Sequence, residues 1–183
     1  MNVKFSTKFV AASAAAVMAL SLAGCSGGSM DDSSSSSAKA SGDSITIGTV
    51  TTNSGTAAAY GEAEVKGFEL AVSEINAKGG INGKKVKLES MDDKGDATEA
   101  SNAYNKLAGD NNVLAVAGPT ISATTAAVAP LADQSKLVTI APAATSDSIE
   151  TGNYLFRTCF KDSYQGEVAA RFAAENLDRR AHV

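Results

Sequence analysis

A cluster of small hydroxyl side chains follows a short apolar run in the middle of the chain. The run reads VLAVAG at 113–118, and hydroxyl residues stand at positions 120, 122, 124 and 125. A helix is expected to begin here, so free backbone N–H groups and the positive end of the helix dipole would face one space. With the Ser122 hydroxyl, that space suits a carboxylate. The same residue types also cap helices, so capping by Thr120 or Ser122 remains an open alternative.

Two further segments offer the complementary chemistry. The loop APAATSDS at 141–148 supplies carbonyls and hydroxyls that could accept hydrogen bonds from an ammonium group. Tyr60 supplies an aromatic face and a phenol in the segment that follows the first predicted strand. A donor-rich wall and an acceptor-rich wall together suit a small zwitterion.

The sequence does not support an enzyme. Its single histidine, His182, is the penultimate residue, and Cys159 has no evident base, so neither a Ser-His-Asp nor a Cys-His arrangement can be assembled. The shortage of His and Cys also argues against zinc. Asp92 and Asp93 could act as an acid–base pair, but solvating a turn and helping to cap the next helix is the favoured interpretation. We therefore expect no catalytic residue, no metal and no cofactor.

Nucleotide and nucleic-acid binding are also disfavoured. The segment GGINGKK at 79–85 has the wrong glycine spacing for a phosphate-binding loop, and it follows a predicted helix instead of a strand. Gly55 and Gly61 do not form the dinucleotide-binding pattern. Lys4 and Lys8 supply +2 to a net charge of −4, which leaves −6 for residues 25–183. Such an acidic chain lacks the basic surface typical of nucleic-acid binding.

The first residues are typical of an export signal. Residues 1–24 carry two lysines, then an apolar run that ends in small residues. The end of this run, Leu22-Ala23-Gly24-Cys25, resembles the lipobox of bacterial lipoproteins, which implies cleavage before Cys25 and its lipidation. An ordinary signal peptide with a chance cysteine is the alternative. Residues 25–42 are rich in Ser and Gly, as expected for a flexible tether. Cys159 would then be unpaired, so we expect no disulfide.

The remainder alternates strands and helices. Strands are predicted at 44–50, 84–91, 113–118, 136–141 and 154–160, with helices between them and a last helix at 164–177. The run at 113–118 is continuously apolar, as in a strand buried on both faces. This order predicts an α/β fold with a doubly wound parallel sheet. Ligands bind such sheets beyond the carboxyl ends of the strands, so loops 51–61, 118–124 and 142–148 are the candidate site.

Three segments together resemble a known family. They are SGTAAAYGEAEVKGFELAVSEINAKGGINGKKVKLESMDD, AVAGPTISATTAAVAPLADQSKLVTIAPAAT and YLFRTCFKDSYQG. They are similar to the amino-terminal part of branched-chain amino acid-binding proteins, the solute receptors of bacterial ABC importers in the type I periplasmic-binding superfamily. The resemblance runs from about Ile45 to the chain end.

The resemblance implies roles for individual residues. Ser122 and nearby backbone would hold the ligand carboxylate, the Ala143 carbonyl and the Thr145 hydroxyl would hold the ammonium, and Tyr60 would line the pocket. It also implies an ABC permease as partner, a monomer, and an extracytoplasmic location at the bacterial membrane through the lipid on Cys25. The alternatives are a receptor for another small polar solute, such as an amide, urea or an aromatic acid, and a sensor ectodomain.

The family has two lobes joined by a hinge, with the ligand between them. By that resemblance, residues 43–153 form the Rossmann-like first lobe, while 154–183 cross over and begin a second lobe that is largely missing. The chain is therefore expected to be an amino-terminal fragment that lacks half of the pocket and possesses an incomplete sheet.

Overall fold

The computed structural model describes residues 44–149 and 152–177. The predicted signal peptide, Cys25 and the predicted tether all lie outside these residues. None of the helices in the described ranges is long and apolar enough to cross a membrane.

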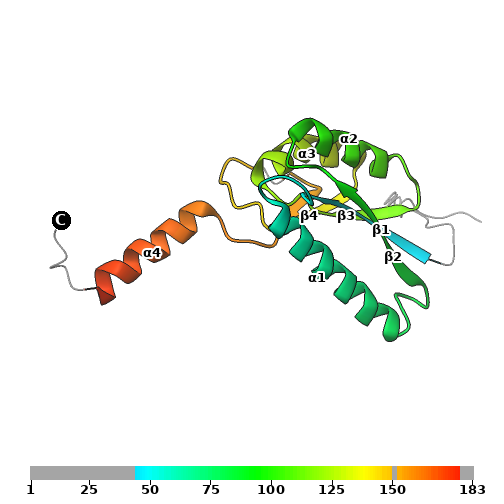
Figure 1. Ribbon diagram of the computed structural model, residues 1–183, viewed down its shortest axis with the longest axis horizontal. Coiled ribbons are helices and arrows are strands. Elements are labelled where there is room, and N and C mark those ends of the chain that lie inside the picture. Colours follow the sequence, from blue (N-terminus) through cyan, green and yellow to red (C-terminus); the bar gives the residue numbers. More distant parts are fainter. Residues whose placement is uncertain (1–43, 150–151, 178–183) are drawn as a thin grey trace, which may run out of the picture. The chain divides into compact units, whose positions relative to one another are not determined.

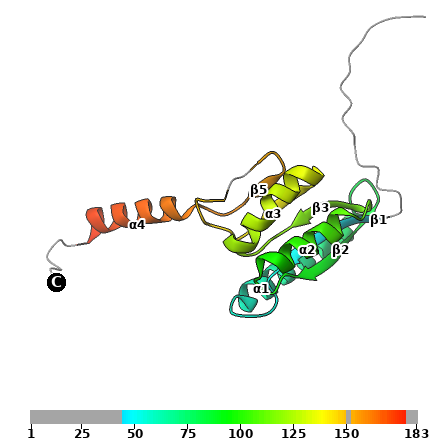
Figure 2. The same ribbon diagram turned by 90° about the horizontal axis from the view of Figure 1, so that it is seen from above.

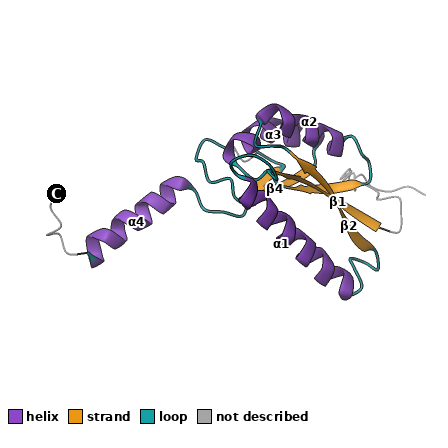
Figure 3. Ribbon diagram, viewed as in Figure 1, coloured by secondary structure: helices purple, strands orange, loops and turns teal. Residues whose placement is uncertain are grey.

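A five-stranded parallel sheet forms the centre of the fold (Figures 1 and 3). Its order is β2-β1-β3-β4-β5, and every pairing is parallel. The strands are β1 (Ser44–Thr51), β2 (Lys85–Asp92), β3 (Val113–Ala117), β4 (Val138–Ala141) and β5 (Leu155–Arg157). The order reverses at β1 and β3, so the predicted doubly wound sheet is confirmed, and the candidate loops meet at this switch point. β5 has three residues and is shorter than the predicted 154–160.

Helices cover the sheet on both faces. They are α1 (Ala58–Ala77), α2 (Ala97–Ala108), α3 (Ser122–Ser135) and α4 (Asp162–Asn176). α2 and α3 pack side by side on one face, while α1 lies against β1 and β2 on the other (Figures 1 and 2). α2 begins after the N-cap residue Asp96, whose carboxylate accepts hydrogen bonds from the backbone N–H groups of Thr98 and Glu99.

The core lies between the sheet and the α2–α3 layer. Tyr104 and Leu107 of α2 are completely buried there, beside Val116 of β3 and Val128 of α3. The Tyr104 hydroxyl is not left unpaired, because it lies 3.1 Å from the Thr139 hydroxyl of β4. This face of the sheet therefore has a continuous packed core.

The opposite face of the sheet is only partly covered. Val138 and Ile140 of β4 are each 40% exposed, and Phe156 of β5 is 48% exposed. Leu114 of β3 is half-buried, so the prediction that this strand is buried on both faces is wrong in the described chain. The reason is that α1 covers β1 and β2, and no helix within residues 44–149 and 152–177 packs on this side of β4 and β5.

α1 approaches the end of β1 through a glycine. Gly61 is buried, and a Cβ at this position would overlap the backbone carbonyl of Thr52. Any side chain would push the first turn of α1 away from the loop after β1. Gly67, two turns further along the same helix, has open space around it.

We therefore predict opposite effects for alanine at the two glycines. Gly61→Ala should destabilise the protein by about 1–3 kcal/mol, because it overpacks backbone against backbone. Gly67→Ala, the matched control, should be neutral or stabilising by up to about 1 kcal/mol through helix propensity. Thermal unfolding followed by circular dichroism measures both. Equal melting temperatures for the two variants would contradict this close approach.

Candidate functional site

A hollow of about 340 Å³ opens at the carboxyl ends of β1, β3 and β4. It is lined by Ala57, Tyr60, Thr120, Ile121, Ser122, Ala143 and Thr145. The structure thus brings the four residues singled out from the sequence into one pocket, although they come from three segments that are far apart along the chain. Their roles in ligand binding remain predictions.

The pocket is bounded on one side by the start of α3. Ser122 is the first residue of this helix, and the N-cap residue, Ile121, makes no side-chain capping hydrogen bond. The Ser122 Oγ accepts a hydrogen bond of 3.2 Å from the backbone N–H of Ser146. That bond joins the loops after β3 and β4, and it leaves the Ser122 hydroxyl hydrogen able to donate to a ligand.

The Thr120 hydroxyl is used elsewhere. It accepts a hydrogen bond of 3.0 Å from the backbone N–H of Thr52 and donates one of 2.6 Å to Glu64. Capping of α3 by Thr120 or Ser122, the alternative left open by the sequence, is therefore wrong. Both hydroxyls connect loops instead, and the N-terminus of α3 keeps its positive dipole end uncapped by side chains.

The next two hydroxyls stabilise the helix from within. Thr124 and Thr125 are completely buried, and each donates a hydrogen bond to the backbone carbonyl of Ile121, at 3.1 and 2.9 Å. The hydroxyl side chains after β3 thus have two structural roles. Thr120 and Ser122 join neighbouring segments, and Thr124 and Thr125 donate hydrogen bonds to a backbone carbonyl. Ser122 alone among them lines the pocket with a half-exposed side chain.

The loop after β4 forms the opposite wall. Within residues 44–149 and 152–177, neither the Ala143 carbonyl nor the Thr145 hydroxyl has a hydrogen-bond partner. Both groups are half-buried. They are therefore available to accept hydrogen bonds from a donor in the pocket, as an ammonium group requires.

Arg157 of β5 holds this loop, and sequence reasoning missed it. Its guanidinium donates to the carbonyls of Ala144, Ser146 and Ile149 at 3.2, 2.9 and 2.9 Å. A rigid fork of donors matches several carbonyls better than a lysine ammonium does. The only available signal in the sequence was an arginine inside an otherwise apolar strand, YLFRTCF.

Tyr60 lies in the first turn of α1 and is 67% exposed. It borders the 340 Å³ pocket and also a second hollow of about 550 Å³ between α1 and the loop after β4. An exposed aromatic ring at a pocket mouth has room to pack against an apolar ligand group.

Behind the pocket, two carboxylates are joined through two threonines. Glu64 accepts from the Thr120 hydroxyl, and Asp93 accepts a 2.6 Å hydrogen bond from the Thr52 hydroxyl. Burial raises the pKa of Glu64, the hydrogen bond from Thr120 opposes this effect, and the nearby charge of Asp93 adds to it. These contacts fix the loops after β1, β2 and β3 to one another.

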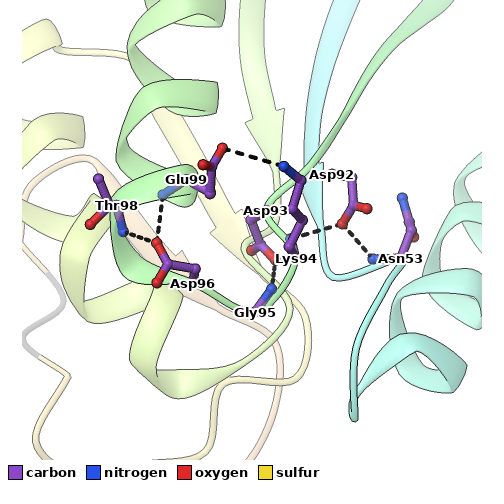
Figure 4. A network of polar contacts seen from close by, with 8 residues as sticks. All are labelled: Asn53, Asp92, Asp93, Lys94, Gly95, Asp96, Thr98 and Glu99. Carbon is purple, nitrogen blue, oxygen red and sulfur yellow. Dashed lines mark hydrogen bonds and ion pairs between the residues drawn. The ribbon is translucent and has the colours of Figure 1, made fainter.

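The paired carboxylates Asp92 and Asp93 organise the loop after β2 (Figure 4). Asp92 Oδ1 accepts from the backbone N–H groups of Asn53 and Lys94 at 2.9 and 2.8 Å, and Asp93 Oδ1 accepts from Gly95 at 2.9 Å. Burial acts to raise the pKa of Asp92, but these backbone hydrogen bonds outweigh it and hold the pKa below its usual value.

This geometry favours the structural interpretation of the pair over acid–base chemistry, with one difference from the sequence-based prediction. The residue that caps α2 is Asp96, and not a member of the pair.

Comparison with known proteins agrees with this architecture. The sequence profile of the family described as periplasmic binding protein matches residues 44–183. The chain belongs to the periplasmic binding protein family.

Individual relatives of this family are similar over the same region. The Leu/Ile/Val-binding protein BraC3 of Rhizobium johnstonii is 37% identical over 142 residues, which cover 76% of this chain and 38% of that relative. The Leu/Ile/Val-binding protein of Escherichia coli K12 is 35% identical over 73% of this chain and 36% of its own length. The chain thus spans somewhat over a third of the length of the curated relatives it matches.

Solved structures of periplasmic binding proteins share the fold. The branched-chain amino acid transporter substrate-binding protein LivJ of Streptococcus pneumoniae, in complex with isoleucine, superposes with a TM-score of 0.69 and 41% identity over 73% of this chain and 39% of its own. An ABC transporter substrate-binding protein of Desulfitobacterium hafniense, in complex with Leu, superposes with a TM-score of 0.66 and 30% identity over 72% of this chain and 39% of its own.

We predict that Arg157→Met loosens the loop of Ala143 and Thr145. Loss of hydrogen bonds from a charged donor to three carbonyls should cost on the order of 3 kcal/mol and lower the melting temperature by several degrees. Arg171→Met removes the same charge from an exposed position of α4 and serves as the control. Both are measured by thermal unfolding; identical melting temperatures would show that Arg157 does not hold the loop.

Proposed function

We propose that this chain is the first lobe of an extracytoplasmic receptor that binds a branched-chain amino acid for an ABC importer. The observation that carries the proposal is the convergence of two complementary walls in one pocket. The uncapped N-terminus of α3 and the Ser122 hydroxyl face the space that is also lined by Ala143 and Thr145.

Each wall suits one end of a zwitterion. The backbone N–H groups and positive dipole end of α3 favour a carboxylate, with the Ser122 hydroxyl as a further donor. The Ala143 carbonyl and Thr145 hydroxyl accept hydrogen bonds from the ammonium, and the Tyr60 ring packs against the ligand side chain. The pocket volume of about 340 Å³ is ample for a single amino acid beside this lobe.

The relatives support the choice of ligand and role. Their names specify leucine, isoleucine and valine, and two structural neighbours contain isoleucine or leucine. Since those proteins are more than twice as long as the matched region, we propose that a second lobe completes the pocket and that the ligand lies between the lobes. The protein then acts by binding and delivering its ligand, as a monomer, and not by catalysis.

One neighbour favours a second candidate ligand class. A solute-binding protein of an ABC transporter from Rhodopseudomonas palustris, in complex with 3,4-dihydroxybenzoic acid, superposes with a TM-score of 0.68 at 26% identity. An aromatic acid would use the carboxylate wall around Ser122 and leave the acceptors Ala143 and Thr145 without an ammonium partner. The acceptor wall therefore favours an amino acid over an aromatic acid.

We predict that the protein encoded by the natural gene binds leucine, isoleucine or valine, and that Ser122→Ala weakens this binding. Loss of one hydroxyl donor to a charged group should cost about 1.5–3 kcal/mol, or roughly 10- to 150-fold in Kd. Isothermal titration calorimetry measures it, with Ser73→Ala at an exposed position of α1 as control. Binding of 3,4-dihydroxybenzoate but of no amino acid would favour the second ligand class.

We further propose that the protein is anchored to the membrane through a lipid on Cys25, which lies outside the described residues. Cys25→Ala should release the protein from the membrane fraction of the producing bacterium, as detected by immunoblotting of separated fractions, while Cys159→Ala should not. Retention of the Cys25→Ala variant in the membrane would contradict a lipid anchor.

A further inference from the structure

Glu64 is a half-buried carboxylate that has no positive partner within residues 44–149 and 152–177. Its Oε2 accepts from the Thr120 hydroxyl, and its Oε1 is buried with no hydrogen bond. In the described part of the chain Glu64 takes part in no ion pair, whereas Glu99 pairs with Lys94. A buried negative charge is costly unless a cation or enough donors compensate it.

The surroundings of Glu64 add to the electrostatic cost of its negative charge. Among the described residues, Asp93 is a charged group that acts on it: burial raises the pKa of Glu64, and repulsion by the Asp93 carboxylate adds to this. Asp93 itself keeps one buried oxygen, Oδ2, without a hydrogen bond. Two carboxylates and two threonine hydroxyls thus form a negative cluster behind the ligand pocket, and a cation nearby would lower its energy.

Glu64 lies close to the acceptor wall of the pocket. It lines the 550 Å³ hollow together with Tyr60 and Ala143, and these two residues also line the 340 Å³ pocket. Ala143, whose carbonyl we assign to the ligand ammonium, therefore lines a hollow that Glu64 lines as well. The two hollows share Ala143, the residue whose carbonyl is expected to bind the positive end of the ligand.

We infer that Glu64 is a specificity-determining residue, whose charge favours ligands with an ammonium group over ligands of the same shape that lack one. This inference rests on the proposed function, because it takes the position of the ammonium from it. Glu64 acts across the adjoining hollow by its charge, while the Ala143 carbonyl and Thr145 hydroxyl make the direct contacts. The Glu64 carboxylate is thus a negative charge within the first lobe that attracts the ammonium group of the ligand.

The test compares two ligands that differ only in the amino group. Leucine and 2-hydroxy-4-methylpentanoate have the same carboxylate and side chain, but a neutral hydroxyl replaces the ammonium in the second. Their Kd values are measured by calorimetry, directly or by competition, on the natural full-length protein. Glu64→Gln keeps the size of the side chain and an oxygen that can accept from Thr120, and it removes the charge.

We expect Glu64→Gln to weaken leucine binding by about five- to tenfold and to change hydroxy acid binding by less than about twofold. Glu64→Asp, which keeps the charge, should retain most of the preference for leucine. Glu62→Gln removes a charge from an exposed position two residues away on α1 and should leave the ratio of the two Kd values unchanged. Glu64→Ala is the second neutral variant if Glu64→Gln does not fold.

Three results would overturn the inference. An equal loss for both ligands would give Glu64 a purely structural role through Thr120. An unchanged ratio in a folded neutral variant would mean that another group, such as one from a second lobe, already neutralises Glu64. If the unmodified protein binds no amino acid, the proposed function fails and this inference fails with it; the first two results leave the proposed function intact.

Discussion

The carboxyl end of β1 is in direct backbone contact with two neighbouring segments, and the site depends on this contact. A Cβ at Gly61 would overlap the Thr52 carbonyl, and one at Gly118 would overlap the Val50 carbonyl. Glycine at both positions lets the first turn of α1 and the loop after β3 approach the same strand end. These close approaches place the first turn of α1 and the start of α3 beside one pocket, which both segments line.

Polar links between loops maintain this arrangement. Thr120 joins Thr52 to Glu64, Ser122 joins the loops after β3 and β4, and Arg157 fixes the loop after β4 through its carbonyls. The link between Thr120 and Thr52 is buried and the others are partly buried, where hydrogen bonds are stronger than in water and unpaired groups are costly. The rigidity of the half-site therefore comes from polar contacts at the edge of the sheet, while the apolar core lies further inside, between the sheet and α2 and α3.

The two faces of the sheet differ in the described chain. α2 and α3 cover one face, where Tyr104, Leu107, Val116 and Val128 are buried, whereas Val138, Ile140 and Phe156 remain exposed on the other. This asymmetry is consistent with a match to somewhat over a third of the length of the relatives. An apolar strand is a reliable sign of burial in the complete fold, but it does not specify which segment provides the cover.

The sequence by itself determined the order of strands and helices, the parallel doubly wound sheet and the three loops of the site, because apolar periodicity, glycine stops and strand connectivity are local or topological properties. It also predicted Tyr60, Ser122, Ala143 and Thr145 as residues of the candidate site, partly through the family resemblance. It could not reveal that Thr120 bonds to Glu64 rather than capping α3, or that Arg157 holds the loop after β4. The contact between Thr120 and Glu64 joins residues that are 56 positions apart, and the contacts of Arg157 join residues that are 8 to 13 positions apart. Only the tertiary structure decides them, because side-chain partners depend on which strand ends become neighbours in the folded sheet.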